Sequence, residues 1–203
     1  MTASTADGVY LRAEGLSRTF GSGPDAVRAV DDVSFEVQAG RTLVLVGESG
    51  SGKTTAARIV LGLERPDAGS VRIEGRQIVG LGDREMREVR RRMQVVLQDP
   101  SSQLNRRHSV EQIVSAPMKA HRIGDRSSRR ERVLQVLESV GLHERHLTRR
   151  PSELSGGQCQ RVAIARALAV DPRLVVLDES VSALDVSVRA QVLNLLRDLQ
   201  DRH

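Results

Sequence analysis

The alternation of hydrophobic and polar residues marks the first part of the chain as rich in β-strands. Apolar residues alternate with polar ones over 9–13 and 33–37, on either side of the turn-rich segment 21–25, and again at Val71 and Ile73. A period of two residues is typical of strands that bury one face. The pattern therefore predicts three half-buried strands.

A continuous apolar run at residues 42–46 predicts a further strand, and a helix follows it. Over residues 53–63 the apolar side chains recur at i, i+3, i+4 and i+7, the spacing of one helix face. A glycine-rich segment separates the two. The sequence thus predicts a strand, a loop and a helix in direct succession.

Helical spacing dominates the later part of the chain. Two segments there match the capping box, in which two side chains three residues apart each bond the other residue's backbone N–H. They are Ser109-x-x-Gln112 and Ser128-x-x-Glu131, and the second precedes an apolar stripe that Gly141 closes. Short apolar runs on either side of these helices predict two core strands, one over 94–97 and one over 174–177.

The glycine-rich segment 47–54 carries the clearest chemical signal. It has the pattern G-x-x-x-x-G-K-[ST], the phosphate-binding loop. Glycines let backbone N–H groups approach a polyphosphate closely, and the start of a helix adds a positive dipole. Lys53 supplies a charge for the terminal phosphates, and Thr54 offers a hydroxyl to Mg²⁺. The alternative is a glycine-rich turn without a ligand. The candidate nucleotide-binding residues are Gly47, Glu48, Ser49, Gly50, Ser51, Gly52, Lys53, Thr54 and Thr55.

The segment 154–158, Leu-Ser-Gly-Gly-Gln, begins another predicted helix. Ser155-x-x-Gln158 matches a capping box, yet two glycines in a first turn cost stability relative to alanine. They are explained if an anion approaches bare N–H groups and a free hydroxyl, which makes Ser155, Gly156, Gly157 and Gln158 a second candidate phosphate contact. An ordinary glycine-containing cap explains the segment equally well, so both interpretations stay open.

Asp178 and Glu179 follow a predicted central strand, at the end where open α/β sheets bind ligands. One carboxylate there can support the Mg²⁺ shell, and the next can polarise an attacking water. The alternative is an aspartate that only caps a turn. Phe20, just before the 21–25 loop, is equally open to two interpretations, a packing residue or an exposed platform for a base.

Composition is typical of a compact cytosolic domain. The chain has 203 residues and a single cysteine, Cys159, so no intrachain disulfide framework is expected. It shows no basic-then-apolar leader and no run of about 18 apolar residues, so we expect neither a signal peptide nor a membrane span.

The net charge of +5 comes almost entirely from arginine, because lysine occurs only at 53 and 119. Arginines cluster within 84–92 and 126–132. A nucleic-acid surface is one interpretation, and a solvated helix face interleaved with glutamates is the other. We favour the second, because single-strand binding also uses stacking aromatics and the chain has one Tyr and two Phe.

Taken in chain order, these segments resemble an ATP-binding cassette (ABC) ATPase. The resemblance rests on the phosphate loop at 47–54, Gln98 at a strand end, the signature at 154–158, the acids Asp178 and Glu179, and the loop 182–185. It covers nearly the whole chain. Within this family, the sequence is similar to the subunits that energise peptide or nickel importers, at Gln98-Asp99-Pro100, at Leu104-Asn105 with Arg107, and over 181–188.

The resemblance implies an α/β fold, a P-loop NTPase (RecA-like) core with an N-terminal antiparallel β subdomain and a helical signature subdomain. It implies one domain over 1–203. About 1–99 and 171–203 are expected to form the core, and about 100–170 the helical subdomain.

The resemblance also implies a head-to-tail dimer, in which the phosphate loop of one subunit and the signature of the other enclose one ATP. Phe20 is expected to stack on adenine, and Asp185 to lie on the dimer seam. Glu179 is the expected general base. The expected groups around Mg²⁺ are Thr54, Gln98 and Asp178, and Gln98 is also expected to sense the attacking water.

We expect an ATP-hydrolysing subunit of a bacterial importer for peptides or a related solute, cytoplasmic and peripheral on the inner face of the cell membrane. Its expected partners are a second ABC ATPase subunit, identical or different, transmembrane permease subunits and, indirectly, a solute-binding protein, with no nucleic acid. The alternatives are a truncated module that binds ATP or docks on a permease without turnover, and a soluble ABC ATPase that acts on nucleic acid.

The histidines provide a further expectation. The family's switch histidine lies on a strand beyond residue 203, so we expect this chain to bind nucleotide and to hydrolyse it poorly. His108, His121, His143 and His146 are expected to be surface residues.

Overall fold

The computed structural model describes residues 8–97, 104–178, 194, 197–198 and 200. The chain forms two compact units, which meet in sequence between Val89 and Arg90. The division into a core and a helical subdomain at about residues 100 and 170 stays a prediction. Within the described part, no helix is both long and apolar enough to span a membrane.

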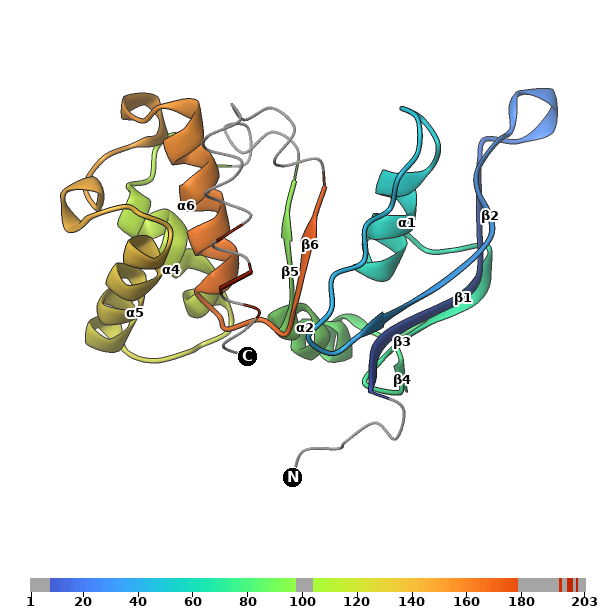
Figure 1. Cartoon of the computed structure of the whole chain (residues 1–203), viewed down its shortest axis with the longest axis horizontal. Coiled ribbons are helices and arrows are strands. Elements are labelled where there is room, and N and C mark those ends of the chain that lie inside the picture. Colours follow the sequence, from blue (N-terminus) through green and yellow to red (C-terminus); the bar gives the residue numbers. More distant parts are fainter. Residues whose placement is uncertain (1–7, 98–103, 179–193, 195–196, 199, 201–203) are drawn as a thin grey trace. The chain divides into compact units, whose positions relative to one another are not determined.

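The first unit is built on a four-stranded antiparallel sheet in the order β2-β1-β3-β4 (Figure 1). Leu11, Ala13, Val71 and Ile73 are buried, as the alternation predicts. The strands are β1 (Val9–Phe20), β2 (Val27–Gln38), β3 (Ala68–Ile73) and β4 (Arg76–Gln77), and the short 3-10 helix η1 (Gly23–Asp25) lies between β1 and β2.

Helix α1 (Lys53–Val60) follows the glycine-rich loop and packs against β1 and β2. Ala56, Ile59 and Val60 are buried, which agrees with their predicted place on one helix face. Leu63 lies beyond the end of the helix and is 56% exposed. The helix therefore begins where the pattern predicts and ends earlier.

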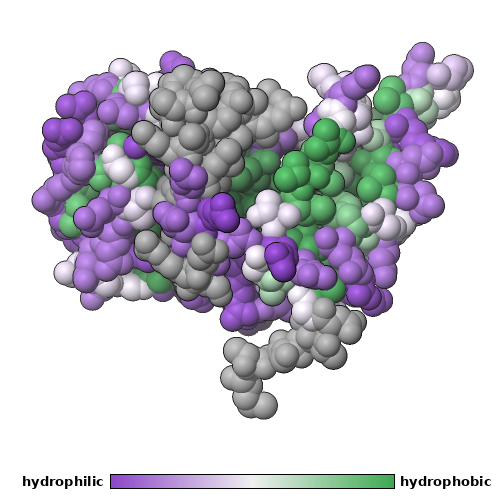
Figure 2. Space-filling model, viewed as in Figure 1, coloured by the Kyte–Doolittle hydropathy of each residue, from purple (hydrophilic) through white to green (hydrophobic). Residues whose placement is uncertain are grey.

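The predicted strand at 42–46 is wrong, because residues 41–48 have no regular secondary structure. Val44 is 72% exposed and Val46 is 90% exposed. Figure 2 shows apolar surface over the part of the molecule where Figure 1 draws α1 and the segment before it. An apolar run forms a strand only when a neighbour supplies the ladder of hydrogen bonds. The sheet of the first unit pairs β1, β2, β3 and β4 with one another and does not include this run.

The second unit contains a parallel pair of strands, β5 (Met93–Val96) and β6 (Leu174–Leu177), with Val96 opposite Leu177. Helix α2 (Asp83–Arg92) precedes β5 and spans the boundary between the units. Both predicted core strands are confirmed, with β5 one residue earlier than expected. All four residues of β6 are half-buried rather than buried, and β5 is the strand that pairs with it.

Three helices carry the hydrophobic core of the second unit. Their apolar faces, including the predicted stripe at Val133, Val136, Leu137 and Val140, pack into one cluster. The helices are α4 (Val110–Ala120), α5 (Arg126–Ser139) and α6 (Gly156–Leu168), and the 3-10 helices η2 (Glu144–His146) and η3 (Pro151–Glu153) lie between α5 and α6.

The capping box at Ser109 and Gln112 is confirmed at the start of α4. The box predicted at Ser128 and Glu131 is wrong, because the cap of α5 is Asp125 and its partner is Ser128. The Asp125 carboxylate accepts the Ser128 N–H at 2.8 Å, and Ser128 Oγ accepts the Asp125 N–H at 2.9 Å. An ionised acceptor makes the stronger cap, so the helix begins one turn earlier.

The last predicted helix carries its apolar stripe at positions outside the described residues. Asn194, Arg197, Asp198 and Gln200 are helical. The stripe itself consists of Val188, Val192, Leu195, Leu196 and Leu199.

Candidate nucleotide-binding site

The phosphate loop turns into α1 at Gly52, the N-cap residue. Its φ of 87° lies in the left-handed region, which favours glycine, and a Cβ there would collide with the carbonyl oxygen of Ala29 in β2. Gly50 has a φ of 83°, but a Cβ there would meet nothing within 4 Å. Gly52 is therefore required by both backbone and packing, whereas Gly50 is required by the backbone alone and leaves the loop open on that side.

The side chain of Lys53 closes the loop from within. Its ammonium nitrogen donates hydrogen bonds to the carbonyl oxygens of Gly47 at 2.9 Å and Glu48 at 2.7 Å, and to Ser51 Oγ at 3.4 Å. Lys53 is also the first residue of α1, and Thr54 and Thr55 follow it in the first turn. The loop thus places a cation beside a helix N-terminus that has no side-chain cap, an arrangement that favours an anion.

Phe20 is the last residue of β1 and is 40% exposed. The guanidinium carbon of Arg18 lies 4.9 Å from the centre of its ring. This exposure favours the platform interpretation over the packing one.

Arg18 is held in place by two acids that sequence reasoning did not single out. It forms ion pairs with Glu64 and Asp67, each at 2.7 Å. The Asp67 carboxylate also accepts the Thr19 N–H at 2.7 Å. This backbone hydrogen bond and the Arg18 contact hold the pKa of Asp67 below its usual range. One signal was available, because residues two apart on a strand share a face, which puts Arg18 beside Phe20.

The signature segment begins α6 with a complete capping box. Gln158 N–H donates to Ser155 Oγ at 3.2 Å, and Ser155 N–H donates to Gln158 Oε1 at 3.0 Å. The expectation of a free Ser155 hydroxyl is therefore corrected, since its oxygen already accepts a hydrogen bond. Its proton is still available for donation, because a hydroxyl both donates and accepts. The Cβ position of Gly156 is open, with nothing within 4 Å.

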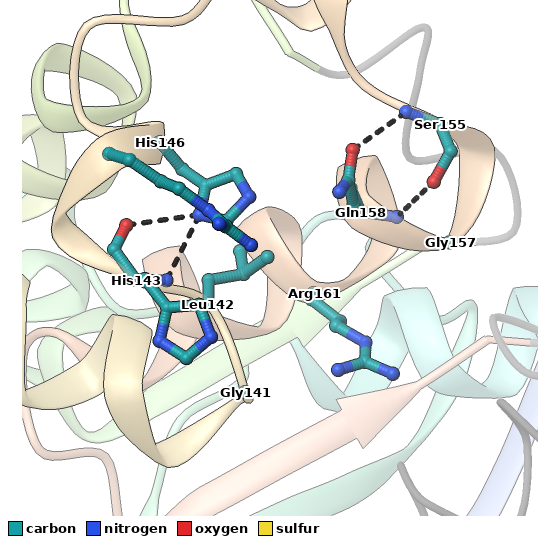
Figure 3. Close-up of a pocket in the computed structure, with 9 residues that line it drawn as sticks. Gly141, Leu142, His143, His146, Ser155, Gly157, Gln158 and Arg161 are labelled. Carbon is teal, nitrogen blue, oxygen red and sulfur yellow. Dashed lines mark hydrogen bonds between the residues drawn. The ribbon is translucent and has the colours of Figure 1, made fainter.

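An open pocket lies beside this cap in the second unit (Figure 3). Arg161, one turn after Gln158, donates to the Val140 carbonyl at 3.2 Å, and η2 supplies the opposite wall. The pocket is lined by Gly141, Leu142, His143, Arg145, His146, Ser155, Gly157, Gln158 and Arg161. Its two arginines make the lining basic, and Leu142 adds an apolar side chain to it.

The expectation that His146 lies on the surface is wrong. The residue is 3% exposed, and its Nδ1 accepts the His143 N–H at 3.0 Å, an interaction drawn in Figure 3. A ring nitrogen that caps a short 3-10 turn gains from burial because its hydrogen bond is then shielded from water. His108 and His143 are exposed, and His121 is half-buried.

The strand ends that were expected to carry the catalytic groups are partly described. Asp178 follows β6 directly, and its N–H donates to the Val96 carbonyl at 2.9 Å, so β5 and β6 end side by side. Gln98, Glu179 and Asp185 lie outside the described residues. Asp178 belongs to the second unit and the phosphate loop to the first.

The second arginine cluster serves the packing of the helical region. Arg130 forms ion pairs with Glu111 at 3.3 Å and with Glu144 at 3.1 Å. Arg132 donates to the carbonyl oxygen of Leu168 at 3.0 Å. These contacts favour the interpretation of a structural helix face over a nucleic-acid surface.

Comparison with known proteins finds relatives along most of the chain. It is 54% identical over 174 residues to a probable peptide ABC transporter ATP-binding protein of Sinorhizobium fredii, a match that covers 86% of this chain and 49% of the relative. It is 44% identical to the di/tripeptide transport ATP-binding protein DppF of Pseudomonas aeruginosa, with 92% of this chain and 58% of the relative covered. The chain thus spans about half the length of these curated relatives.

A solved structure and a family model agree with these relatives. The dimeric ATP-binding cassette MJ0796, solved in a post-hydrolysis state with ADP and Pi, superposes with a TM-score of 0.86 at 31% identity, over 95% of this chain and 83% of that one. The agreement confirms the predicted α/β P-loop fold. The family model described as "ABC transporter" matches residues 30–182. The chain therefore belongs to the ABC transporter family.

Proposed function

We propose that this chain is the ATP-binding and ATP-hydrolysing part of an ABC transporter subunit that energises the import of peptides or a related solute. The observation that carries the proposal is the loop closed around Lys53, with carbonyl contacts of 2.9 and 2.7 Å, at the uncapped start of α1. A triphosphate suits both features, because its oxygens accept hydrogen bonds from first-turn N–H groups and from the ammonium, which exchanges its long contact to Ser51 Oγ for a phosphate oxygen.

We further propose that a magnesium ion binds together with the nucleotide. Thr54, half-buried in the first turn of α1, and Asp178, at the end of β6, supply oxygen ligands of the kind that Mg²⁺ prefers. Together with Gln98, they are the residues we assign to this ion. When bound, the ion neutralises charge on the terminal phosphate oxygens.

The hydrolytic step is assigned to residues at the two strand ends. Glu179 follows Asp178, and its carboxylate accepts a proton from the water that attacks the terminal phosphorus. As the new P–O bond forms, the bond from this phosphorus to the bridging oxygen breaks, and ADP leaves with that oxygen. Gln98 follows β5, the neighbour of β6, and orients that water through its amide. Lys53 holds the terminal phosphate during the transfer, and its positive charge compensates the negative charge of the terminal phosphate oxygens.

We also propose a head-to-tail dimer with a second ABC ATPase subunit. The start of α6 offers a hydroxyl proton at Ser155 and N–H groups at Gly156 and Gly157, but no lysine, so it suits the outer side of a phosphate already held elsewhere. The solved relative MJ0796 is described as dimeric with ADP and Pi. Asp185 is assigned to the seam of this dimer, and Phe20 to the adenine.

The relatives' names support a place in peptide transport. The Sinorhizobium and Pseudomonas proteins are described as peptide and di/tripeptide transport ATP-binding proteins. In this proposal the chain binds transmembrane permease subunits on the cytoplasmic face of the cell membrane. A solute-binding protein selects the cargo and acts with this chain only indirectly.

The test of nucleotide binding is Lys53→Ala, measured by isothermal titration with MgATP. Loss of the ammonium should weaken binding about 100-fold, since a hydrogen bond to a charged group contributes roughly 1.5–3 kcal/mol. Lys119→Ala, which removes the other lysine of the chain, is the matched control and should leave the affinity unchanged. Equal affinities for Lys53→Ala and the unsubstituted chain would remove the loop from the proposed function.

The test of assembly is light scattering on Glu179→Gln with saturating MgATP and the permease. Loss of the general base should trap a dimer, and Ser155→Arg added to it should abolish the dimer by placing a bulky side chain at the start of α6. Ser152→Arg, at an exposed position of η3, is the control for an added arginine. A particle with one copy of Glu179→Gln under these conditions would contradict the dimer.

A further inference from the structure

Phe20 belongs to a cluster with Arg18, Glu64 and Asp67, in which Arg18 contacts the ring and the two acids pair with Arg18. Arg18 and Phe20 lie two residues apart on β1, and the guanidinium of Arg18 lies 4.9 Å from the ring centre. A cation at this distance over a ring face is attracted by the ring quadrupole. One face of the ring is therefore occupied, while the residue as a whole stays 40% exposed.

The guanidinium of Arg18 is itself held in place by two acidic side chains. Its two terminal nitrogens form ion pairs with Glu64 and Asp67, each at 2.7 Å. Its Nε is buried and has no hydrogen-bond partner among the described residues. A freely solvated arginine would turn this group to water, so the two acids set the plane of the guanidinium at the expense of Nε.

Both acids lie on the connection that leaves the phosphate-loop helix. Glu64 and Asp67 follow α1 and precede β3, and the Asp67 N–H donates to the Ser17 carbonyl at 2.8 Å. The same aspartate accepts the Thr19 N–H at 2.7 Å. The end of β1 is thus tied to the α1–β3 connection on both sides of Arg18.

The strand pairing of the sheet also places this cluster close to the phosphate loop. Arg18 is paired with Val30 of β2, and a Cβ on Gly52 would lie 3.6 Å from Val30 Cγ2. Gly52 therefore lies against the residue that is directly across from Arg18. A nucleotide with its phosphates at this loop has its base within reach of the end of β1.

We infer that Arg18, clamped by Glu64 and Asp67, is a positioning residue that backs one face of Phe20 and leaves the other face for the nucleotide base. The inference rests on the proposed function, because it concerns the base of the same nucleotide. Arg18 acts through the ring and not on the phosphates. Its removal should therefore weaken binding of a nucleotide without weakening binding of a triphosphate that has no base.

The experiment compares two ligands, MgATP and magnesium tripolyphosphate, by isothermal titration. Arg18→Gln should weaken MgATP binding about fivefold, the size expected for an exposed cation–π contact, and leave tripolyphosphate binding unchanged. Arg28→Gln removes an arginine paired with Asp31 on the neighbouring strand and is the matched control. Arg18→Lys, which keeps the charge but not the planar fork, should give an intermediate loss.

A double-mutant cycle separates positioning from a structural tie. Phe20→Ala should weaken MgATP binding about tenfold, and Arg18→Gln in that background should have no further effect. Equal losses with both ligands, or an undiminished effect of Arg18→Gln without Phe20, would overturn the inference. Failure of the unsubstituted chain to bind either ligand would instead overturn the proposed function, so the two failures are distinguishable.

Discussion

The two glycine-rich helix starts of the molecule are built in opposite ways. At α1 the N-cap is Gly52, which is left-handed and has no side chain, and Lys53 donates to the carbonyl oxygens of Gly47 and Glu48 in the loop before it. At α6 the N-cap is Ser155, extended, with a reciprocal bond to Gln158. The first start therefore has no side-chain cap, whereas the second is capped by a side chain of its own sequence.

The difference assigns different roles to the glycines. A side chain at Gly52 would meet the backbone of β2, but a Cβ at Gly156 would meet nothing within 4 Å. Glycine at 52 is therefore part of the fold as well as the site. Glycine at 156 has no such structural reason, so approach by a ligand or a partner subunit is the explanation that its cost in helix stability favours.

The largest change in unfolding free energy that would test this comparison is expected from substituting these glycines by alanine. Gly52→Ala should destabilise the chain by about 3 kcal/mol, because a left-handed alanine costs roughly 1–2 kcal/mol and overpacking against Ala29 adds a similar amount. Gly156→Ala should stabilise α6 by about 0.5 kcal/mol. Urea unfolding followed by circular dichroism measures both.

Gly50→Ala is the intermediate case. It carries the same backbone strain as Gly52→Ala without the collision, so it should cost about 1 kcal/mol. If Gly156→Ala destabilised the chain as much as Gly52→Ala, the two helix starts would not differ in the way described.

The elements that could be predicted from the sequence are those whose signal is local. The caps at Ser109 and Ser155 are confirmed because both partners of each hydrogen bond lie within three residues. The cap at Ser128 was misplaced for a related reason. Two overlapping patterns compete there, and the ionised Asp125 makes the stronger bond.

Contacts between distant segments could not be read in this way. The run at 42–46 has the composition of a central strand, but a strand also needs a neighbour, and composition does not identify one. Arg18 forms its ion pairs with Glu64, 46 positions later in the chain, and with Asp67, 49 positions later. Contacts over such distances leave no periodic pattern in the sequence, so they could not be predicted from it. Burial of His146 depends likewise on the packing of η2.

The last prediction tests whether the Ser155 cap of α6 does more than stabilise the helix. Ser155→Ala should cost about 1 kcal/mol of stability, the usual value for a lost N-cap, and Ser109→Ala should cost the same, because the hydroxyls accept at nearly equal distances, 3.2 and 3.3 Å. Urea unfolding of the two variants measures this. Only Ser155 lies on the surface assigned to a partner's phosphate, so only Ser155→Ala should also weaken the ATP-dependent dimer of Glu179→Gln in light scattering. If both serines weakened the dimer equally, the Ser155 hydroxyl would act through helix stability alone, and the difference between the two helix starts would be a difference in capping and nothing more.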